Sequence, residues 1–125
     1  MNRVTTLAVS TAIVLWAGAS AAVAQSAPPT YQADSDVYKV IFEDQNFRVI
    51  AATWKKGVHD KAHSHPVPSM AYSLTDCMLR IYEPDGKTRE INNKAGATQA
   101  VPITQSHSAE NIGPADCSVV FVERK

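Results

Sequence analysis

Histidine is the residue type in this chain whose spacing points most clearly to chemistry. Three of the four histidines lie between residues 59 and 65, and the fourth is His107. His63 and His65 are separated by one residue, and on a β-strand such residues point to the same face of the sheet. Both imidazoles could therefore reach one metal ion, and neutral imidazole suits Zn, Cu, Fe and Ni. Two ligands are too few for a tight site, so a third must come from elsewhere, and His107 is the only distant candidate of this type.

The histidine pair also has a simpler interpretation, because a match to so short a motif often arises by chance. In that interpretation His63 and His65 are two surface histidines in a loop that ends at Pro66. His59 stands beside Asp60 in a polar stretch, and we expect it to be a solvated loop residue more than a ligand. The pair by itself leaves both interpretations open.

The first 24 residues have the pattern of a secretory signal peptide. Arg3 supplies the positive charge, residues 7–16 are apolar and uncharged, and Ala22-Val23-Ala24 is a small-x-small cleavage site. A membrane anchor is the alternative, but the apolar stretch is short for one and is diluted by Thr and Ser. We therefore expect export to the periplasm or secretion, with cleavage after Ala24 and no membrane span in the mature chain.

Cleavage would leave 125 − 24 = 101 residues, and loss of Arg3 would leave 12 − 1 = 11 basic side chains against 12 acidic ones. This length favours a single domain. The near balance of charge argues against nucleic acid as a partner, because nucleic-acid-binding proteins usually carry a basic excess. Two cysteines are too few for a disulfide-framework miniprotein or for a four-cysteine zinc site.

The mature chain reads as short strands separated by turns. Residues 25–36 are rich in Pro, Ala and polar residues and are expected to form a flexible leader before a domain over 37–125. Turn signals such as Pro84-Asp85-Gly86 separate the apolar or alternating segments. The expected strands are 37–42, 47–54, 71–74, 78–82, 87–91, 97–103, 107–112 and 117–123. No segment has a sustained helical period, so the pattern indicates an all-β sandwich or barrel.

The surroundings of the histidines resemble the two sequence motifs of the cupin superfamily, in its small single-domain form. The first half of the first motif is matched, with five residues and then one residue between them, by Gly57, His63 and His65. The second motif is matched, with five, four and three intervening residues, by Gly96, Pro102, His107 and Asn111. The resemblance covers residues 40–123, nearly the whole mature chain.

This resemblance implies a single antiparallel β-barrel of jelly-roll type. It implies that His63, His65 and His107 bind a divalent transition metal inside the barrel, with Fe, Mn, Ni, Cu and Zn as the candidates. The remaining motif residues are expected to be structural: Gly57, Gly96, Pro102 and Asn111. A small-molecule ligand or substrate and a homodimer are further expectations from the family.

The chain departs from the family pattern at the fourth ligand. The family usually supplies a Glu four or five residues after the second histidine, where this chain has Ser69 and Met70. A site of three histidines leaves positions open for water or substrate, and the thiol dioxygenases among the cupins use three. Met70 and His59 are weak candidates for a fourth ligand. A methionine would favour copper, although a core position on a strand is the simpler expectation for Met70.

The resemblance also brings the two cysteines together. In a jelly-roll, the turn that holds Cys77 and the start of the last strand at Cys117 lie at the same end of the barrel. We therefore expect a disulfide between them in an oxidising compartment. The alternative is a pair of unpaired thiols that act as small buried apolar groups.

Two functions are in closest competition. The first is a metal-dependent enzyme, a dioxygenase or isomerase that acts on a small molecule. The second is a non-enzymatic metal- or small-ligand-binding protein of the cell envelope, which the missing Glu and the lack of an evident acid or base favour. A purely structural or interaction protein is the third hypothesis, because one fold hosts many functions.

Overall fold

The computed structural model describes residues 18–20 and 25–125. The expected signal peptide covers residues 1–24 and, apart from residues 18–20, lies outside the described part. Within the described residues, no helix has both the length and the apolar character needed to cross a bilayer.

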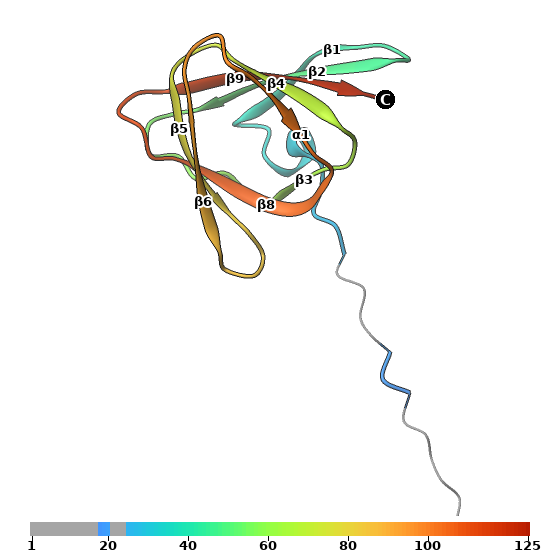
Figure 1. Ribbon diagram of the computed structural model, residues 1–125. Coiled ribbons are helices and arrows are strands. Elements are labelled where there is room, and N and C mark those ends of the chain that lie inside the picture. The colour runs from blue at the N-terminus through green and yellow to red at the C-terminus, as the bar shows by residue number, and fades with distance from the viewer. Residues whose placement is uncertain (1–17, 21–24) are drawn as a thin grey trace, which may run out of the picture.

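The described residues contain one short helix and nine β-strands (Figure 1). The elements are α1 (Thr30–Ala33), β1 (Tyr38–Glu43), β2 (Phe47–Trp54), β3 (His63–His65), β4 (Ser69–Ser73), β5 (Cys77–Tyr82), β6 (Thr88–Asn93), β7 (Thr98–Val101), β8 (Thr104–Asn111) and β9 (Cys117–Arg124). The sequence analysis located seven of these strands closely. It missed β3, and it expected β8 to begin at His107, three residues after its observed start.

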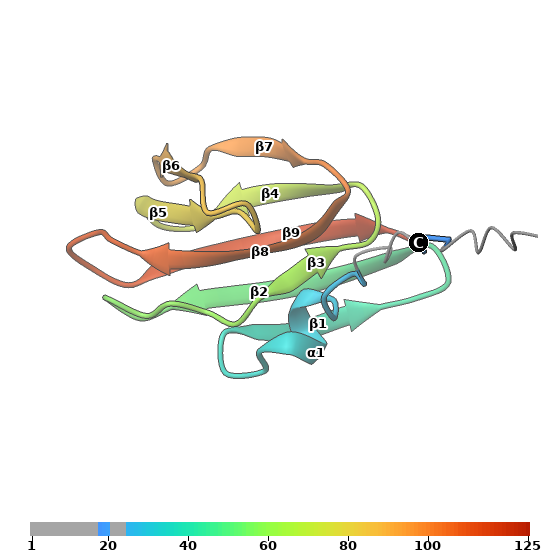
Figure 2. The ribbon, with the colours of Figure 1, turned by 90° about the horizontal axis from the view of Figure 1, so that it is seen from below.

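The strands form two antiparallel sheets that face each other (Figures 1 and 2). The five-stranded sheet has the order β1-β2-β9-β4-β7, and the four-stranded sheet has the order β3-β8-β5-β6. The all-β jelly-roll prediction is confirmed. The barrel is not closed, because among the described residues no ladder of paired strands joins the two sheets. The chain alternates between sheets instead, so the fold is a two-sheet sandwich with a cavity between its layers.

Side-chain alternation along the strands builds the core. In β9 every second residue from Cys117 to Glu123 is buried, and β5 shows the same alternation from Cys77 to Ile81. Because successive residues of a strand point to opposite faces, each strand directs one row of side chains between the sheets. The largest apolar side chain buried there is Trp54, which is 1% exposed.

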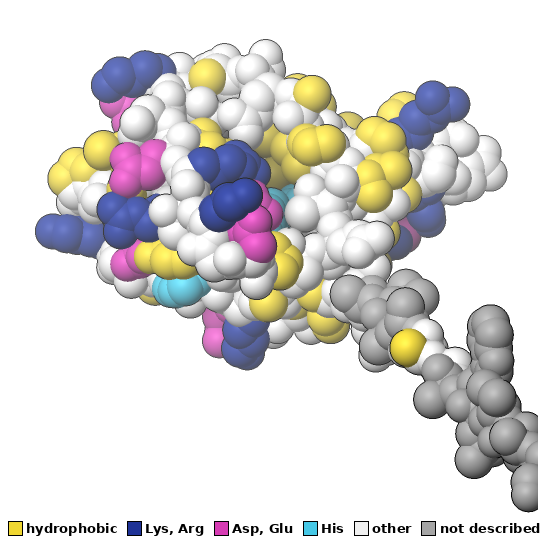
Figure 3. Space-filling model, turned by 60° about the horizontal axis from the view of Figure 1, so that its bottom comes forward, with side chains coloured by type: hydrophobic (Ala, Val, Ile, Leu, Met, Phe, Trp, Pro, Cys, Tyr) yellow, Lys and Arg dark blue, Asp and Glu magenta, His cyan; other side chains and the backbone are white. Residues whose placement is uncertain are grey.

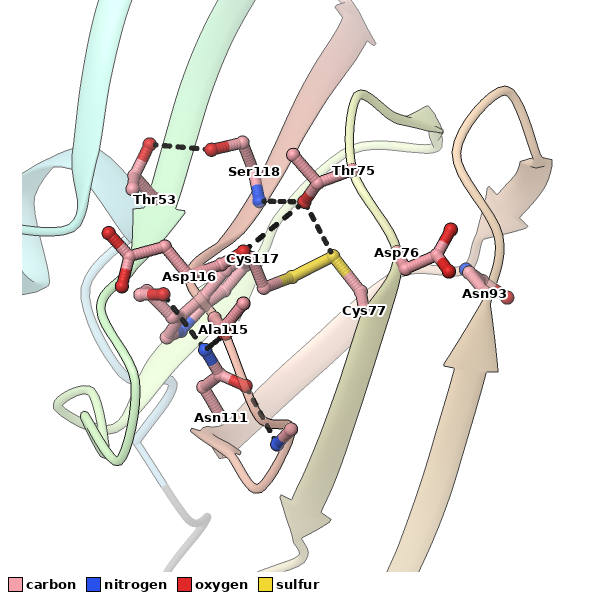
Figure 4. The surroundings of a disulfide bond; sticks show 12 residues. Thr53, Thr75, Asp76, Cys77, Asn93, Asn111, Ala115, Asp116, Cys117 and Ser118 are labelled. Atoms are coloured by element: carbon pink, nitrogen blue, oxygen red, sulfur yellow. Dashed lines mark hydrogen bonds between the residues drawn. A yellow bond between two sulfur atoms is a disulfide. The ribbon is translucent and has the colours of Figure 1, made fainter.

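A disulfide joins the two sheets at one end of the sandwich. Cys77 begins β5 in the four-stranded sheet, and Cys117 begins β9 in the five-stranded sheet (Figure 4). Their sulfur atoms are 2.05 Å apart and their Cα atoms 5.0 Å apart, which confirms the predicted bridge. Beside it, the Thr75 hydroxyl accepts a hydrogen bond from the Ser118 N–H at 2.9 Å.

The motif residues outside the histidines lie in turns and connections or, in the case of Asn111, at the end of β8. Gly57 and Gly96 have φ angles of 77° and 85°, in the left-handed region that favours glycine. The Asn111 side chain donates hydrogen bonds to the Trp54 and Ala115 carbonyl oxygens at 3.0 and 2.8 Å and accepts one from the Gly113 N–H at 2.9 Å (Figure 4). Asn111 therefore closes the turn between β8 and β9.

The segment expected to be a flexible leader packs against the domain. The Ser64 N–H donates to the Pro28 carbonyl at 2.8 Å, and the Ala27 N–H donates to the Gln105 carbonyl at 2.9 Å. Thr30 in α1 and Asp34 after it are both buried. The composition of residues 25–36 is that of a loop, but this segment covers the free edge of β3, whose backbone would otherwise lack partners.

Candidate metal centre

Two neighbouring strands of the four-stranded sheet carry the three histidines. His63 and His65 lie on β3, His107 lies on β8, and His63 is the direct cross-strand partner of His107. All three side chains are buried, with residue exposures of 1%, 3% and 8% in chain order. The structure thus excludes the interpretation of His63 and His65 as surface histidines in a loop.

The histidine nitrogens lie at distances that suit one shared ion. One ligand atom from each residue can be chosen so that all three lie within 4.8 Å of one another. The Nε2 atoms of His65 and His107 are 3.1 Å apart. Two nitrogens bound to one ion at about 2.0–2.1 Å lie roughly 3.0–3.5 Å apart at tetrahedral or octahedral angles. The His65–His107 pair therefore needs little movement to coordinate a metal ion.

The protein leaves nitrogens of His65 and His107 without other partners. The Nδ1 atoms of both are buried and make no hydrogen bond within the described residues. Their Nε2 atoms contact each other. A buried polar group normally has a hydrogen-bond partner, so a purely structural histidine would be bonded at both nitrogens. Within the described residues the two Nε2 atoms have no partner but each other, and this pair fits an ion bound between them.

Burial keeps two of the imidazoles in the neutral, metal-binding form. It lowers the pKa of His65 to about 4, with a smaller contribution from the neighbouring His63. Burial also lowers the pKa of His107 to about 3, helped by His63, by His65 and by the positive charge of Arg89. A histidine ligand must be deprotonated, and at neutral pH both side chains already are.

His63 is oriented by a backbone carbonyl and a buried carboxylate. Its Nδ1 lies 3.0 Å from the Lys61 carbonyl oxygen, and because a carbonyl can only accept, Nδ1 carries the proton. One carboxylate oxygen of Asp60 lies 3.6 Å from the same nitrogen. The Nε2 atom is then the one with a free lone pair. This arrangement of carboxylate, histidine and candidate ion is common around metal sites, where it fixes the tautomer of the histidine and the orientation of its ring.

Asp60 and Tyr38 belong to the site although the sequence analysis did not select them. The Asp60 carboxylate accepts hydrogen bonds from the Tyr38 hydroxyl at 2.6 Å, from Trp54 Nε1 at 2.8 Å and from the Ala109 N–H at 2.7 Å. The Tyr38 hydroxyl also lies 3.4 Å from His63 Nε2. Burial, followed by the charge of Asp60, raises the Tyr38 pKa well above its usual value, so the phenol stays protonated.

The two weak candidates for a fourth ligand lie away from the histidine group. Met70 points out of β4 and is 39% exposed, so it is neither a ligand nor a core residue. His59 is exposed, contacts the Ser108 hydroxyl at 2.8 Å and stacks on the Tyr82 ring. Neither side chain is a fourth ligand. The exposure of His59 agrees with the expected solvated position, whereas the expected core position of Met70 is wrong. Among the described residues the Tyr38 hydroxyl, not Met70 or His59, lies beside the histidine group, at His63.

The histidines open into a cavity between the two sheets. Its volume is 110 Å³, and His63, His65 and His107 lie in its wall together with apolar side chains of β4, β5 and β9. Viewed from below, a histidine surface is visible at the bottom of a hollow that charged and apolar side chains surround (Figure 3). A cavity of this size holds about four waters or a ligand of similar bulk.

Solved structures show the same arrangement of strands. A cupin domain from Bordetella pertussis Tohama I aligns with a TM-score of 0.66 and 18% identity, over 71% of this chain and 92% of that one. The chain has the cupin fold. An RmlC-like cupin from Methanocaldococcus jannaschii aligns with a TM-score of 0.57 and 15% identity, over 70% and 78% of the two chains.

A structure of oxalate decarboxylase also aligns with this chain, with a TM-score of 0.56 and 23% identity. The match covers 74% of this chain but 27% of the oxalate decarboxylase chain. No family model and no curated relative matches the sequence. The likeness therefore establishes the fold, and the function must be argued from the site itself.

Proposed function

We propose that this cupin binds one divalent transition metal ion through His63, His65 and His107 and uses it to hold a small molecule in the cavity. The observation that carries the proposal is the cluster of three buried imidazoles. One nitrogen of each lies within 4.8 Å of the others, and within the described residues the Nε2 atoms of His65 and His107 have no partner but each other. Fe, Mn, Ni, Cu and Zn are the candidate ions, because imidazole ligands suit all of them.

When bound, such an ion would polarise a carbonyl group or, if it is redox-active, activate dioxygen. The residues of the chain supply the rest of the site. Three imidazoles hold the ion, and Asp60 with the Lys61 carbonyl fixes the orientation of His63. Apolar side chains such as Leu79 and Phe121 line the cavity and limit the access of water. These features support a metal-dependent enzyme of the dioxygenase or isomerase type.

A non-enzymatic binding protein is the second candidate, and the composition of the cavity wall favours it. Among the described residues, the wall contains no Asp or Glu that could serve as an acid or base. The Tyr38 phenol remains protonated because burial raises its pKa, so it cannot act as a base at neutral pH, and its O–H already donates to Asp60.

We also propose that the protein is exported. The signal-peptide pattern of residues 1–24 supports export. The Cys77–Cys117 disulfide is consistent with it, because disulfides persist in oxidising compartments such as the periplasm.

The deciding experiment is metal analysis of protein purified without an affinity tag or chelators. We expect about one equivalent of a transition metal per chain, retained in His59→Ala and lost in His63→Ala, His65→Ala and His107→Ala. His59→Ala is the matched control, because His59 lies outside the cavity wall. Mass spectrometry of the same preparation should give a chain that begins at Gln25.

Absence of stoichiometric metal from the native protein, or equal retention in all four variants, would overturn the metal centre. An intact Met1 in the exported fraction would overturn cleavage. Oxygen uptake with panels of thiols, diketones and phenols then separates a dioxygenase from a binding protein, since only a dioxygenase consumes dioxygen in step with the substrate.

A further inference from the structure

The cavity around the histidines has an unbalanced charge. Among the described residues of its wall, Arg89 is the only Lys or Arg, and there is no Asp or Glu. The position at which the family usually supplies a Glu ligand has Ser69 and the outward-facing Met70 instead. An ion held by three neutral imidazoles keeps its full positive charge, because no carboxylate ligand offsets it.

The side chain of Arg89 is placed to receive a ligand. Arg89 lies on β6, where its Nε donates to one Glu83 carboxylate oxygen at 3.2 Å. Its two terminal NH₂ groups make no hydrogen bond within the described part of the chain. Arg80, on the neighbouring strand β5, instead donates from a terminal nitrogen to Glu90 at 3.0 Å and lies outside the cavity wall.

Neutral hydrogen-bonding groups complete the polar side of the wall. Asn93, Gln99 and Thr104 line the same cavity as Arg89. The Asn93 amide donates to the Gln99 side-chain oxygen at 2.9 Å, which leaves the Gln99 NH₂ group free to donate to a ligand. The cavity thus combines hydrogen-bond donors and one positive charge with apolar side chains.

We propose that the cavity binds a small carboxylate. Its carboxylate group would lie on the terminal nitrogens of Arg89, and the rest of the molecule would extend toward the histidines. The second point of attachment is the metal ion, so the inference rests on the proposed metal centre. The planar fork of a guanidinium matches a carboxylate in two parallel hydrogen bonds. The volume of 110 Å³ favours a small ligand, of about six heavy atoms. A single arginine favours a carboxylate over phosphate, whose three oxygens need more donors.

Calorimetric titration of the Ni²⁺-loaded and the metal-free protein with anions tests this inference. The probes are pyruvate and malonate, their neutral analogues methyl pyruvate and malonamide, and inorganic phosphate. We expect the carboxylates to bind more tightly than the neutral analogues and phosphate. Arg89→Met should weaken carboxylate binding about tenfold, the lower end for a hydrogen bond to a charged group, because Arg89 is half exposed.

Two further variants sharpen the result. Glu83→Gln should strengthen carboxylate binding about threefold, because it removes the anion that competes for Arg89. Arg80→Met is the matched control and should leave the affinity unchanged, since its side chain lies outside the cavity wall. Melting curves of all variants establish that they are folded.

Unchanged carboxylate affinity in Arg89→Met, or equal affinity for the neutral analogues, would overturn the inference even where Ni²⁺ binds stoichiometrically, and the metal centre would then stand alone. Tighter binding of phosphate than of pyruvate would overturn the choice of carboxylate. If the protein binds no Ni²⁺ but Arg89→Met still weakens carboxylate binding, the proposed metal centre fails and the anion site stands.

Discussion

One buried carboxylate connects the candidate metal centre to the rest of the core. Asp60 receives hydrogen bonds from side chains on β1 and β2 and from the backbone of β8, and it lies beside His63. Each of its oxygens therefore faces at least one donor. A charge this deeply buried is tolerated only when it is fully hydrogen-bonded, so the role of Asp60 depends on its being an acceptor at both oxygens.

The substitution Asp60→Asn tests this role. An amide NH₂ group would replace one acceptor and face either the Ala109 N–H or the hydroxyl of Tyr38 and the indole of Trp54. We expect a loss of about 2–4 kcal/mol in the free energy of unfolding and roughly tenfold weaker metal binding. Urea denaturation and metal competition assays measure the two effects. Asp36→Asn, at an exposed position, is the control and should change neither; a folded Asp60→Asn protein with unchanged metal affinity would contradict the role.

The same residues show what sequence can indicate about a site. His63, His65 and His107 could be selected because their side-chain type and their spacing carry the signal. Asp60 and Tyr38 could not, because their role arises only when β1, β2, β3 and β8 meet around one carboxylate. The weak candidate Met70 failed for a related reason: its orientation depends on the register of β4, which a five-residue strand does not reveal.

At the scale of elements, the disulfide holds together two sheets that are not paired with each other. Cys77 and Cys117 are separated by 40 residues and begin one strand in each sheet. Closing a loop of this length stabilises the fold mainly by restricting the unfolded chain, by about 4 kcal/mol in the chain-entropy account. The bridge therefore compensates for the small core of a domain of this size.

The double variant Cys77→Ala/Cys117→Ala should lose about 2–4 kcal/mol of unfolding free energy. Urea denaturation without reductant measures the loss. Native protein in mild reductant is the comparison: because both cysteines are buried, we expect the bridge to resist reduction until the chain unfolds. A denaturation midpoint equal to that of the wild type would contradict this account.

Element boundaries were predictable where a strand is long enough to show alternation. The strands β2, β5 and β9 carry clear alternating or apolar patterns and were located nearly to the residue. The strand β3 has three residues, too few for a period. Residues 25–36 have the composition of a loop, and their packing depends on a partner, the free edge of β3, that only the folded sheet provides.

At the scale of the whole molecule, the balanced formal charge of zero conceals a strongly pH-dependent interior. His65 and His107 have folded-state pKa values of about 4 and about 3, well below the ordinary value of 6.5, chiefly because of burial. Between about pH 4 and 6.5 the unfolded chain binds protons at these residues and the folded metal-free chain does not. Acidification through this range therefore favours unfolding, and above it these residues contribute no pH dependence.

We expect the unfolding free energy of the metal-free protein to fall as the pH is lowered from 6.5 to 4. Two protons give a slope of at most about 2.7 kcal/mol per pH unit. Glu123 partly offsets this slope. Burial raises the pKa of its carboxyl group, so protonation of Glu123 on acidification favours the folded state. Urea denaturation in chelator at several pH values measures the slope. In the double variant His65→Gln/His107→Gln the slope should shrink by nearly the full contribution of the two histidines, whereas an equal slope in both proteins would contradict the neutral pair.

Added Ni²⁺ should shift the acid transition of the wild type to lower pH, because the ion competes with protons for the same nitrogens, and should leave the double variant unchanged.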